Sequence, residues 1–214
     1  MERILFRNVM PAVFANRGDI DSEIWGKEIE LRRGGLYLVE AASGQGKSTF
    51  CSYVAGYRND FTGSLLFDSQ DTRDLKVADW VRTRRTSISL LFQELRLFPE
   101  LTALENVEIK NKLTGFKQGQ TIRQWFERLG IADKADTKVA QMSFGQQQRV
   151  ALMRALAQPF DFLLADEPIS HLDDDNSSIM GEIMLEEAKS QGSAVIVTSI
   201  GKHIELDYER RIKL

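Results

Sequence analysis

The sequence predicts an α/β fold with a parallel core sheet, an antiparallel β piece on its N-terminal side and a helical lobe. The first observation is a set of short apolar blocks, typical of parallel strands covered on both faces, at 36–40, 87–92, 162–165 and 194–198. The second is the alternation of these blocks with segments of helical spacing. The third is a mostly helical stretch from about 94 to 158.

The remaining elements follow from the same patterns. Further strands are expected at 4–9, 24–31, 64–67 and 210–214. The early strands do not alternate with helices, so they are expected to form the antiparallel piece. Helices are expected at 47–55, 103–113, 121–129, 144–157 and 176–190.

The 214 residues suit a single domain, 1–214, because no Pro/Ser/Gly-rich linker divides them. We expect a core formed by about 1–93 and 159–214, and a helical lobe formed by about 94–158.

The apolar runs are far shorter than the ~18 residues of a membrane span, and the N-terminus does not resemble a signal peptide. Cys51, the only cysteine, can form neither an internal disulfide nor a thiolate metal site. A net charge of −3 gives no reason to expect a nucleic-acid partner, and the chain is expected in the cytoplasm.

A candidate phosphate-binding loop follows the strand expected at 36–40. The sequence Ala-Ala-Ser-Gly-Gln-Gly-Lys-Ser-Thr at 41–49 lies between this strand and a helix, the context of a P-loop. Glycines let backbone N–H groups point at phosphate oxygens, the lysine supplies a positive charge, and the first hydroxyl can ligate Mg²⁺. The candidate nucleotide-binding residues are Ser43, Gly44, Gln45, Gly46, Lys47, Ser48 and Thr49. The first glycine of the motif is replaced by Ala41, which would be strained only if that position requires a positive φ.

Two adjacent carboxylates, Asp166 and Glu167, end the apolar strand expected at 162–165. The carboxyl edge of a parallel sheet is where such sheets bind ligands. Asp166 is therefore a candidate member of the Mg²⁺ shell, and Glu167 is a candidate catalytic residue that polarises an attacking water. A solvated turn that merely closes the strand is the alternative for this pair.

Three further segments carry a resemblance to a known family. Met-Ser-Phe-Gly-Gln at 142–146, with the helix after it, resembles the LSGGQ signature of ABC-transporter ATPases. Leu-Phe-Gln at 91–93 resembles the Q-loop of that family, and Ser-His-Leu-Asp at 170–173 resembles its D-loop. The order and spacing of these motifs agree with those of the family over nearly the whole chain. The residues that flank the motifs are most similar to the macrolide-export, lipoprotein-release and cell-division branch.

The resemblance implies a P-loop NTPase fold, with ATP and Mg²⁺ as cofactors and two cassettes paired head to tail as a homodimer or a heterodimer. It implies that a partner cassette touches the γ-phosphate in trans through its Ser143, Gly145 and Gln146. The family's pattern makes Gln93 a catalytic residue that ligates Mg²⁺ or the lytic water, with Ser48 and Asp166 as the other metal ligands. Asp173 is placed at the dimer seam. Phe14 is our candidate for stacking on adenine, with a core position as the alternative.

Three positions depart from the family's pattern: Ala41, Phe144 in place of the first signature glycine, and Ser199 in place of the switch histidine. If the backbone of Phe144 is helical and its ring points away, the anion contact survives. A serine at 199 is shorter than histidine and uncharged, so hydrolysis is expected to be reduced. His203 could substitute only if its loop bulges; an exposed loop histidine is the alternative.

The expected function is that of an ATP-binding, ATP-hydrolysing subunit of an ABC transporter, peripheral on the cytoplasmic face of the membrane. A separate membrane permease would dock near 93–101, where apolar residues are too many for a bare loop. The alternative is a nucleotide-gated regulatory or scaffolding cassette with little turnover. The basic run Arg82, Arg84 and Arg85 is either a solvated face or a contact for a partner or anionic lipid. The sequence does not identify the substrate, the direction of transport or the permease.

Overall fold

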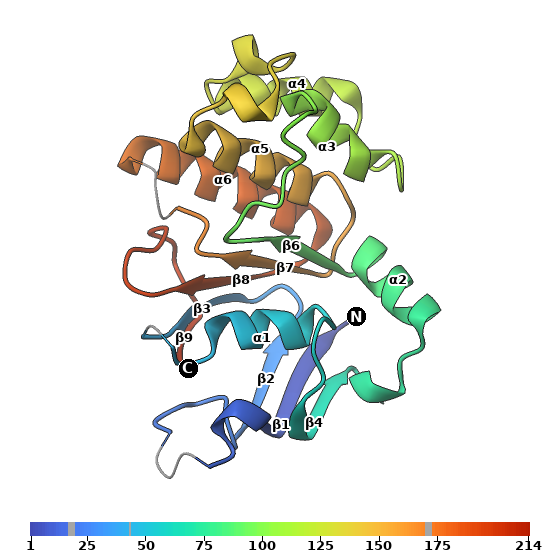
Figure 1. Ribbon diagram of the computed structural model, residues 1–214, viewed down its shortest axis with the longest axis vertical. Helices are drawn as coiled ribbons and strands as arrows, with labels where there is room; N and C mark the ends of the chain where they lie inside the picture. Colours follow the sequence, from blue (N-terminus) through green and yellow to red (C-terminus); the bar gives the residue numbers. More distant parts are fainter. Residues whose placement is uncertain (17–19, 43, 170–172) are drawn as a thin grey trace.

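A five-stranded sheet forms the centre of the molecule. The computed structural model describes residues 1–16, 20–42, 44–169 and 173–214 (Figure 1). Within the sheet the order is β6-β7-β8-β3-β9, and all neighbouring strands are parallel. The strands are β6 (Ile88–Leu91), β7 (Phe162–Asp166), β8 (Ala194–Ser199), β3 (Leu36–Glu40) and β9 (Arg210–Lys213). The predicted α/β class with a parallel core is confirmed, because every predicted core block forms one of these strands.

The N-terminal β piece is a second sheet, with the order β2-β1-β4-β5 and antiparallel pairing. Its strands are β1 (Arg3–Pro11), β2 (Glu28–Arg32), β4 (Phe61–Phe67) and β5 (Gln70–Asp71). The predicted strand at 24–31 is wrong at its start, because Gly26 has a φ of 69° and turns the chain before β2 begins. Ile24 and Trp25 are nevertheless buried, so these residues are apolar because they lie in the core and not because they form a strand.

Helix α1 (Lys47–Val54) lies between the two sheets (Figure 1). Its buried side chains join one apolar cluster with residues of β1 and β3. Phe50 stacks on Phe6 of β1 with 5.3 Å between ring centroids, and Tyr53 meets Trp25 edge to face. This packing on both sides fixes the position of the helix, and with it the loop that precedes it.

The other face of the central sheet carries helices that share a second apolar cluster with β7 and β8 (Figure 1). These helices are α3 (Ala103–Asn111), α4 (Gly119–Arg128), α5 (Phe144–Leu156) and α6 (Asp174–Gln191). Helix α2 (Val77–Thr86), which the element prediction leaves out, has no buried residue. Short 3₁₀ turns occupy η1 (Ala12–Phe14), η2 (Thr72–Asp74), η3 (Ala132–Lys134) and η4 (Val139–Gln141). The division into a core and a lobe at 94–158 stays a prediction.

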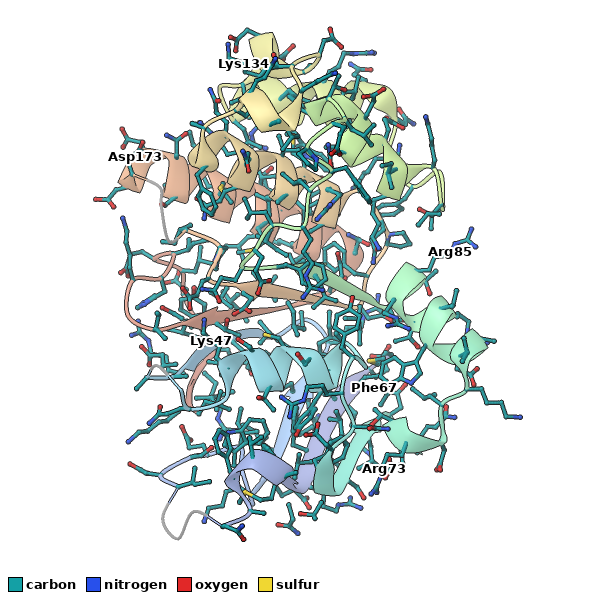
Figure 2. All side chains as sticks on the ribbon, in the orientation of Figure 1. Lys47, Phe67, Arg73, Arg85, Lys134 and Asp173 are labelled. Atoms are coloured by element: carbon teal, nitrogen blue, oxygen red, sulfur yellow. The ribbon has the colours of Figure 1, made fainter. Side chains whose placement is uncertain are left out.

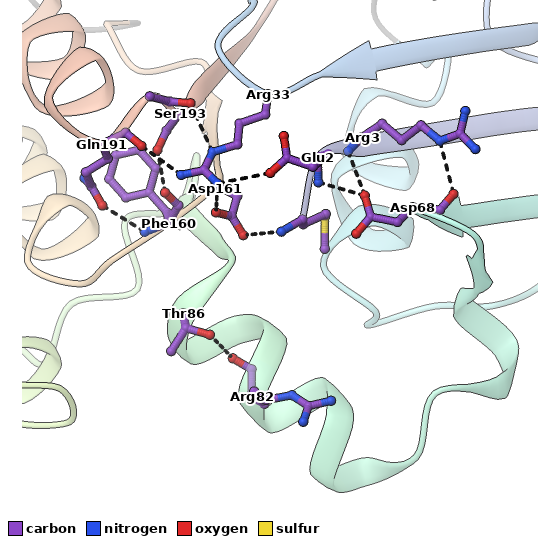
Figure 3. A network of polar contacts seen from close by, with 12 residues as sticks. Glu2, Arg3, Arg33, Asp68, Arg82, Thr86, Phe160, Asp161, Gln191 and Ser193 are labelled. Carbon is purple, nitrogen blue, oxygen red and sulfur yellow. Dashed lines mark hydrogen bonds and ion pairs between the residues drawn. The ribbon is translucent and has the colours of Figure 1, made fainter.

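A polar network joins the two sheets at the end opposite the P-loop (Figure 3). Asp161, just before β7, accepts a hydrogen bond of 2.9 Å from the amino group of Met1 and lies 3.3 Å from Arg33. Arg33 also donates to the carbonyl of Gln191 at the end of α6. One carboxylate thus ties the start of β7 to the chain ahead of β1 and to the turn between β2 and β3.

Among the described residues, no helix combines the length and the apolar character that crossing a bilayer requires.

Candidate nucleotide-binding site

The loop between β3 and α1 has the backbone geometry that its glycines predict. Gly44 and Gly46 have φ values of 81° and 99°. A Cβ on Gly46 would lie 2.7 Å from the ring of Phe14, so glycine is required there by conformation and by space. Ala41 does not adopt a positive φ, and its amide donates to the carbonyl of Ser199. Alanine at that position therefore carries no backbone strain.

A cavity of about 420 Å³ opens at the N-terminal end of α1. It brings together Gly44, Gly46, Lys47, Ser48 and Thr49 of the loop. Residues from other elements that line it are Val13, Phe14, Ala42, Arg58, Gln93, Glu167 and Ile200. The first turn of α1 thus faces a space that also contains a lysine, a glutamate and a glutamine, as the sequence predicts. Ser43 lies outside the described residues.

Gln45 stabilises the loop through two hydrogen bonds. Its side-chain Oε1 accepts a hydrogen bond of 2.7 Å from the amide of Ala42, and its carbonyl accepts one of 3.1 Å from the indole of Trp25. The side chain of this residue therefore shapes the loop, while its backbone role toward a phosphate stays a prediction.

Lys47 lies at the N-terminal end of α1 (Figure 2) and lines the main cavity. Its ammonium group is buried, forms an ion pair with Glu167, and lies 3.4 Å from Oδ1 of Asp166. Glu167 has a φ of 47°, a conformation that non-glycine residues rarely adopt. The adjacent carboxylates that the sequence singles out therefore converge on the P-loop lysine, across 120 residues of chain.

Asp166 is held by its neighbours in the sheet. The hydroxyl of Thr198, opposite it on β8, donates to its Oδ1 at 2.5 Å. Cys51 lies close to this carboxylate, and burial, with the nearby negative charge, raises the pKa of the thiol well above its ordinary value. Cys51 therefore stays a neutral thiol in the core. Ser48 and Asp166 both border a smaller cavity of about 50 Å³ beside the loop.

Gln93 lines the main cavity from the segment after β6. Two and three residues further along, Leu95 and Arg96 have positive φ values, of 58° and 50°. Arg154 of α5 donates to the carbonyls of these two residues at 2.5 and 2.6 Å. Burial lowers the pKa of Arg154 to about 10. A half-buried guanidinium thus ties the segment after Gln93 to the helix that follows the signature.

The signature residues form the N-terminal cap of α5. The hydroxyl of Ser143 accepts from the amide of Gln146, and the Gln146 side chain accepts in return from the amide of Ser143. Phe144 is the first residue of the helix, so its backbone is helical as the anion contact requires. Neither Ser143 nor Gln146 lines the main cavity within the chain, and Gly145 does not line it either.

Asp173, just before α6, caps that helix by accepting from the amide and the side chain of Asn176 (Figure 2). These hydrogen bonds lower the pKa of its carboxyl. Arg149 of α5 donates to the side-chain oxygen of Asn176 at 2.6 Å, which connects this cap to the signature helix. The other residues of the D-loop resemblance, 170–172, lie outside the described residues.

The position of the family's switch histidine falls at the end of β8 and in the segment that follows it. Ser199 is buried, and its hydroxyl accepts from the amide of Gly201 and donates to the carbonyl of Lys202, so it is occupied within its own loop. The next residue, Ile200, is 54% exposed and lines the cavity. His203 packs against Tyr208 and is not among the residues that line the cavity.

Phe14 lines the cavity but is 6% exposed, and it packs on Gly46 and Trp25. Its neighbour Val13 is 55% exposed in the same cavity. Stacking of Phe14 on adenine stays a prediction, and its burial favours support of the loop. Sequence reasoning missed Val13, Arg58 and Ile200, because each lies outside a recognisable motif and only the fold brings it to the cavity.

Residues 26–170 match the protein-family model described as ABC transporter. The lipoprotein-releasing system ATP-binding protein LolD of Myxococcus xanthus is 31% identical over all of this chain and 96% of its own length. The macrolide export ATP-binding/permease protein MacB of a Shewanella species is 31% identical over 87% of this chain, which spans only 29% of that protein. The solved dimeric structure of the ATP-binding cassette MJ0796 in a post-hydrolysis state, bound to ADP and Pi, superimposes with a TM-score of 0.80 at 28% identity, covering 99% of this chain and 94% of its own.

Fold and site define a P-loop NTPase. The chain belongs to the ABC transporter family, as an ATP-binding cassette.

Proposed function

We propose that the chain is the ATP-binding and ATP-hydrolysing subunit of an ABC transporter, which dimerises on ATP and drives a separate membrane permease. The observation that carries this proposal is the convergence of Lys47, Ser48, Gln93 and Glu167 on one cavity at the N-terminus of α1. Backbone amides at a helix N-terminus and a lysine are suited to a triphosphate. LolD is named as the ATP-binding protein of a lipoprotein-releasing system, and MacB as a macrolide export ATP-binding/permease protein.

The chemistry divides among the residues of this cavity. The amides of the loop and Lys47 hold the phosphates, and Glu167 orients and polarises the attacking water. Ser48, Asp166 and Gln93 supply the hydroxyl, carboxylate and amide oxygens that suit Mg²⁺, which would neutralise charge on the phosphates. Because Glu167 is paired with Lys47, the phosphate tail must compete with this carboxylate for the lysine.

A second cassette completes the site. Within one chain Ser143 lies outside the main cavity, yet it caps α5 so that this helix presents its positive N-terminal end outward. In a head-to-tail dimer, Ser143, Gly145 and Gln146 of one cassette would meet the γ-phosphate held by the other, with Asp173 at the seam. The MJ0796 cassette is described as dimeric, which supports this arrangement.

Reduced turnover is the second part of the proposal. The hydroxyl of Ser199 is occupied within its own loop, and the exposed residue of this segment at the cavity is Ile200, whose side chain can neither donate nor accept a hydrogen bond. These observations also favour the second candidate function, a nucleotide-gated regulatory or scaffolding cassette with little turnover. The two differ in whether phosphate is released.

The permease is proposed to dock on a groove of about 330 Å³ between the segment after Gln93 and helices α3 and α5. Phe98 is exposed there, while Leu95 is buried in the core. The groove is lined by Arg84, Arg96, Lys110 and Arg154, and the described lining residues include no carboxylate, although Glu94 lies 3.8 Å from Arg96. Burial and neighbouring cations lower the pKa of Lys110. An apolar groove with this charge fits a short amphipathic helix that carries an acidic side chain.

The proposal is tested with the purified chain. Calorimetry with Mg-ATP measures binding, and phosphate release measures turnover, with K47A as the control that loses the P-loop charge. Binding with release above the control supports an ATPase; binding without release supports the regulatory cassette; no binding contradicts both. Docking is tested by co-purification of a membrane protein from detergent-solubilised membranes. The charge reversal K110E should abolish co-purification, whereas K189E, on α6 away from the groove, should not.

A further inference from the structure

Arg58 is a second cationic side chain on the wall of the nucleotide cavity, and no sequence motif includes it. It follows α1 by four residues and reaches back along the helix, where its Nη1 lies 3.3 Å from the hydroxyl oxygen of Thr49. Both residues line the cavity. Among the described residues that line this cavity, Lys47 and Arg58 carry the positive charges.

The guanidinium of Arg58 is held in place before any ligand arrives. Asp60 accepts from its Nε at 2.9 Å and from its Nη2 at 2.5 Å, a two-point contact that fixes the plane of the group and raises the pKa of Arg58. The ring of Tyr53 lies 5.7 Å below the guanidinium carbon, and the Tyr53 hydroxyl donates to the carbonyl of Asp60. Asp60 thus occupies two of the three nitrogens, and the third, Nη1, is directed to Thr49.

The two cations serve opposite ends of the loop. Lys47 faces Asp166 and Glu167, the end where the family's chemistry places the transferred phosphate. Thr49 lies two residues further into the first turn of α1, and its hydroxyl accepts from Arg58. A hydroxyl that accepts from a cation retains its own proton for donation and is a stronger donor for it.

We propose that Arg58, together with the hydroxyl of Thr49, binds the α-phosphate of the nucleotide, the phosphate next to the sugar. This inference rests on the proposed function, because it assumes that a nucleotide occupies the cavity. The group that Arg58 recognises is common to ATP and ADP. Its contact is therefore a uniform binding interaction, which affects affinity and not the chemical step.

The test compares R58M, which keeps the length of the side chain without its charge, with R58K, which keeps the charge. Affinities for Mg-ATP and Mg-ADP are measured by calorimetry on the full chain. R58M is expected to bind both nucleotides about tenfold more weakly, the effect of losing one charge-assisted hydrogen bond. R58K is expected to recover part of this loss. In turnover, R58M should raise KM with kcat unchanged.

A matched control exists in Arg73, whose Nε and Nη2 contact Asp71 in the same two-point manner at 3.1 and 2.7 Å, outside the cavity. R73M should lower thermal stability to a similar extent as R58M but leave nucleotide affinity unchanged. Equal affinities of R58M and wild type overturn the inference, as does a loss confined to ATP. R58Q replaces R58M if the latter does not fold, with the same criteria. No binding by the wild type contradicts the proposed function itself, and the inference with it.

Discussion

Lys47 and Glu167 form a buried ion pair, although one is predicted to hold the phosphates and the other to activate water. The pair joins the first residue of α1 to the residue after β7. It therefore links the P-loop to the acidic end of β7, which the central sheet brings together. Each partner is less than a tenth exposed. Buried charges of this kind depend strongly on one another, because either one alone would remain without compensation.

Replacing Glu167 by Gln should uncouple binding from turnover. The amide retains the size of the side chain and a hydrogen-bonding oxygen, but it cannot take up a proton from water. We expect phosphate release to fall at least about 100-fold while Mg-ATP still binds and the ATP-dependent dimer persists. Phosphate-release assays and size-exclusion chromatography with ATP check this. Unchanged turnover would remove Glu167 from its assigned role.

Replacing Lys47 by Met should lower the free energy of unfolding by about 3 kcal/mol, because it leaves Asp166 and Glu167 side by side without their cation. The double variant K47M/E167Q should be more stable than K47M alone, since one of the two carboxylates is then neutral. Urea denaturation of the four proteins, measured without nucleotide, gives the coupling between the two positions. Simple additivity of the two changes would contradict the interaction.

Ser143 should have two separable roles, one in stability and one in dimerisation. S143A removes the cap of α5 and should lower the free energy of unfolding by about 1 kcal/mol. Thr102 caps α3 through the same reciprocal contacts with Glu105, so T102A should have a similar effect on stability. Only S143A should abolish the ATP-dependent dimer, as measured by light scattering. If T102A abolished it equally, the loss would reflect stability and not the signature.

The sequence was sufficient to predict those parts of the fold and the site that depend on neighbouring residues along the chain, such as an apolar block followed by a glycine-rich motif. The apolar block before Gly44 and Lys47 predicts both a buried strand and the loop after it. Residues outside any motif are different, since Arg58 reaches the cavity by folding back along α1 and Ile200 by its place after β8. The mistaken start of the strand at 24–31 has the same origin, because Trp25 is apolar for packing against α1 and not for pairing in a sheet.

The stability of the control pair Arg73–Asp71 should depend on pH. Hydrogen bonds from Arg73 lower the pKa of Asp71 to about 2 in the folded protein, from 3.8. A lowered carboxyl pKa stabilises the folded state above the unfolded value, and this contribution is lost as pH falls from about 4 to about 2. D71N should therefore cost about 1–2 kcal/mol at pH 7, with the difference from wild type shrinking below pH 4.

Histidine substitutions at the last residue of β8 and at the residue after it should show which of the two positions can take the role of the family's switch histidine. Ile200 is exposed at the cavity, so I200H would place an imidazole there, where it can bond to water or phosphate, and turnover should rise several-fold. S199H should instead lower stability, because the buried site is filled and the hydroxyl bonds to Gly201 and Lys202 are lost. Phosphate-release rates and thermal unfolding of both variants check this pair of expectations. A rise in turnover in S199H, with none in I200H, would show that the loop rearranges around residue 199 and that the buried hydroxyl is not its anchor.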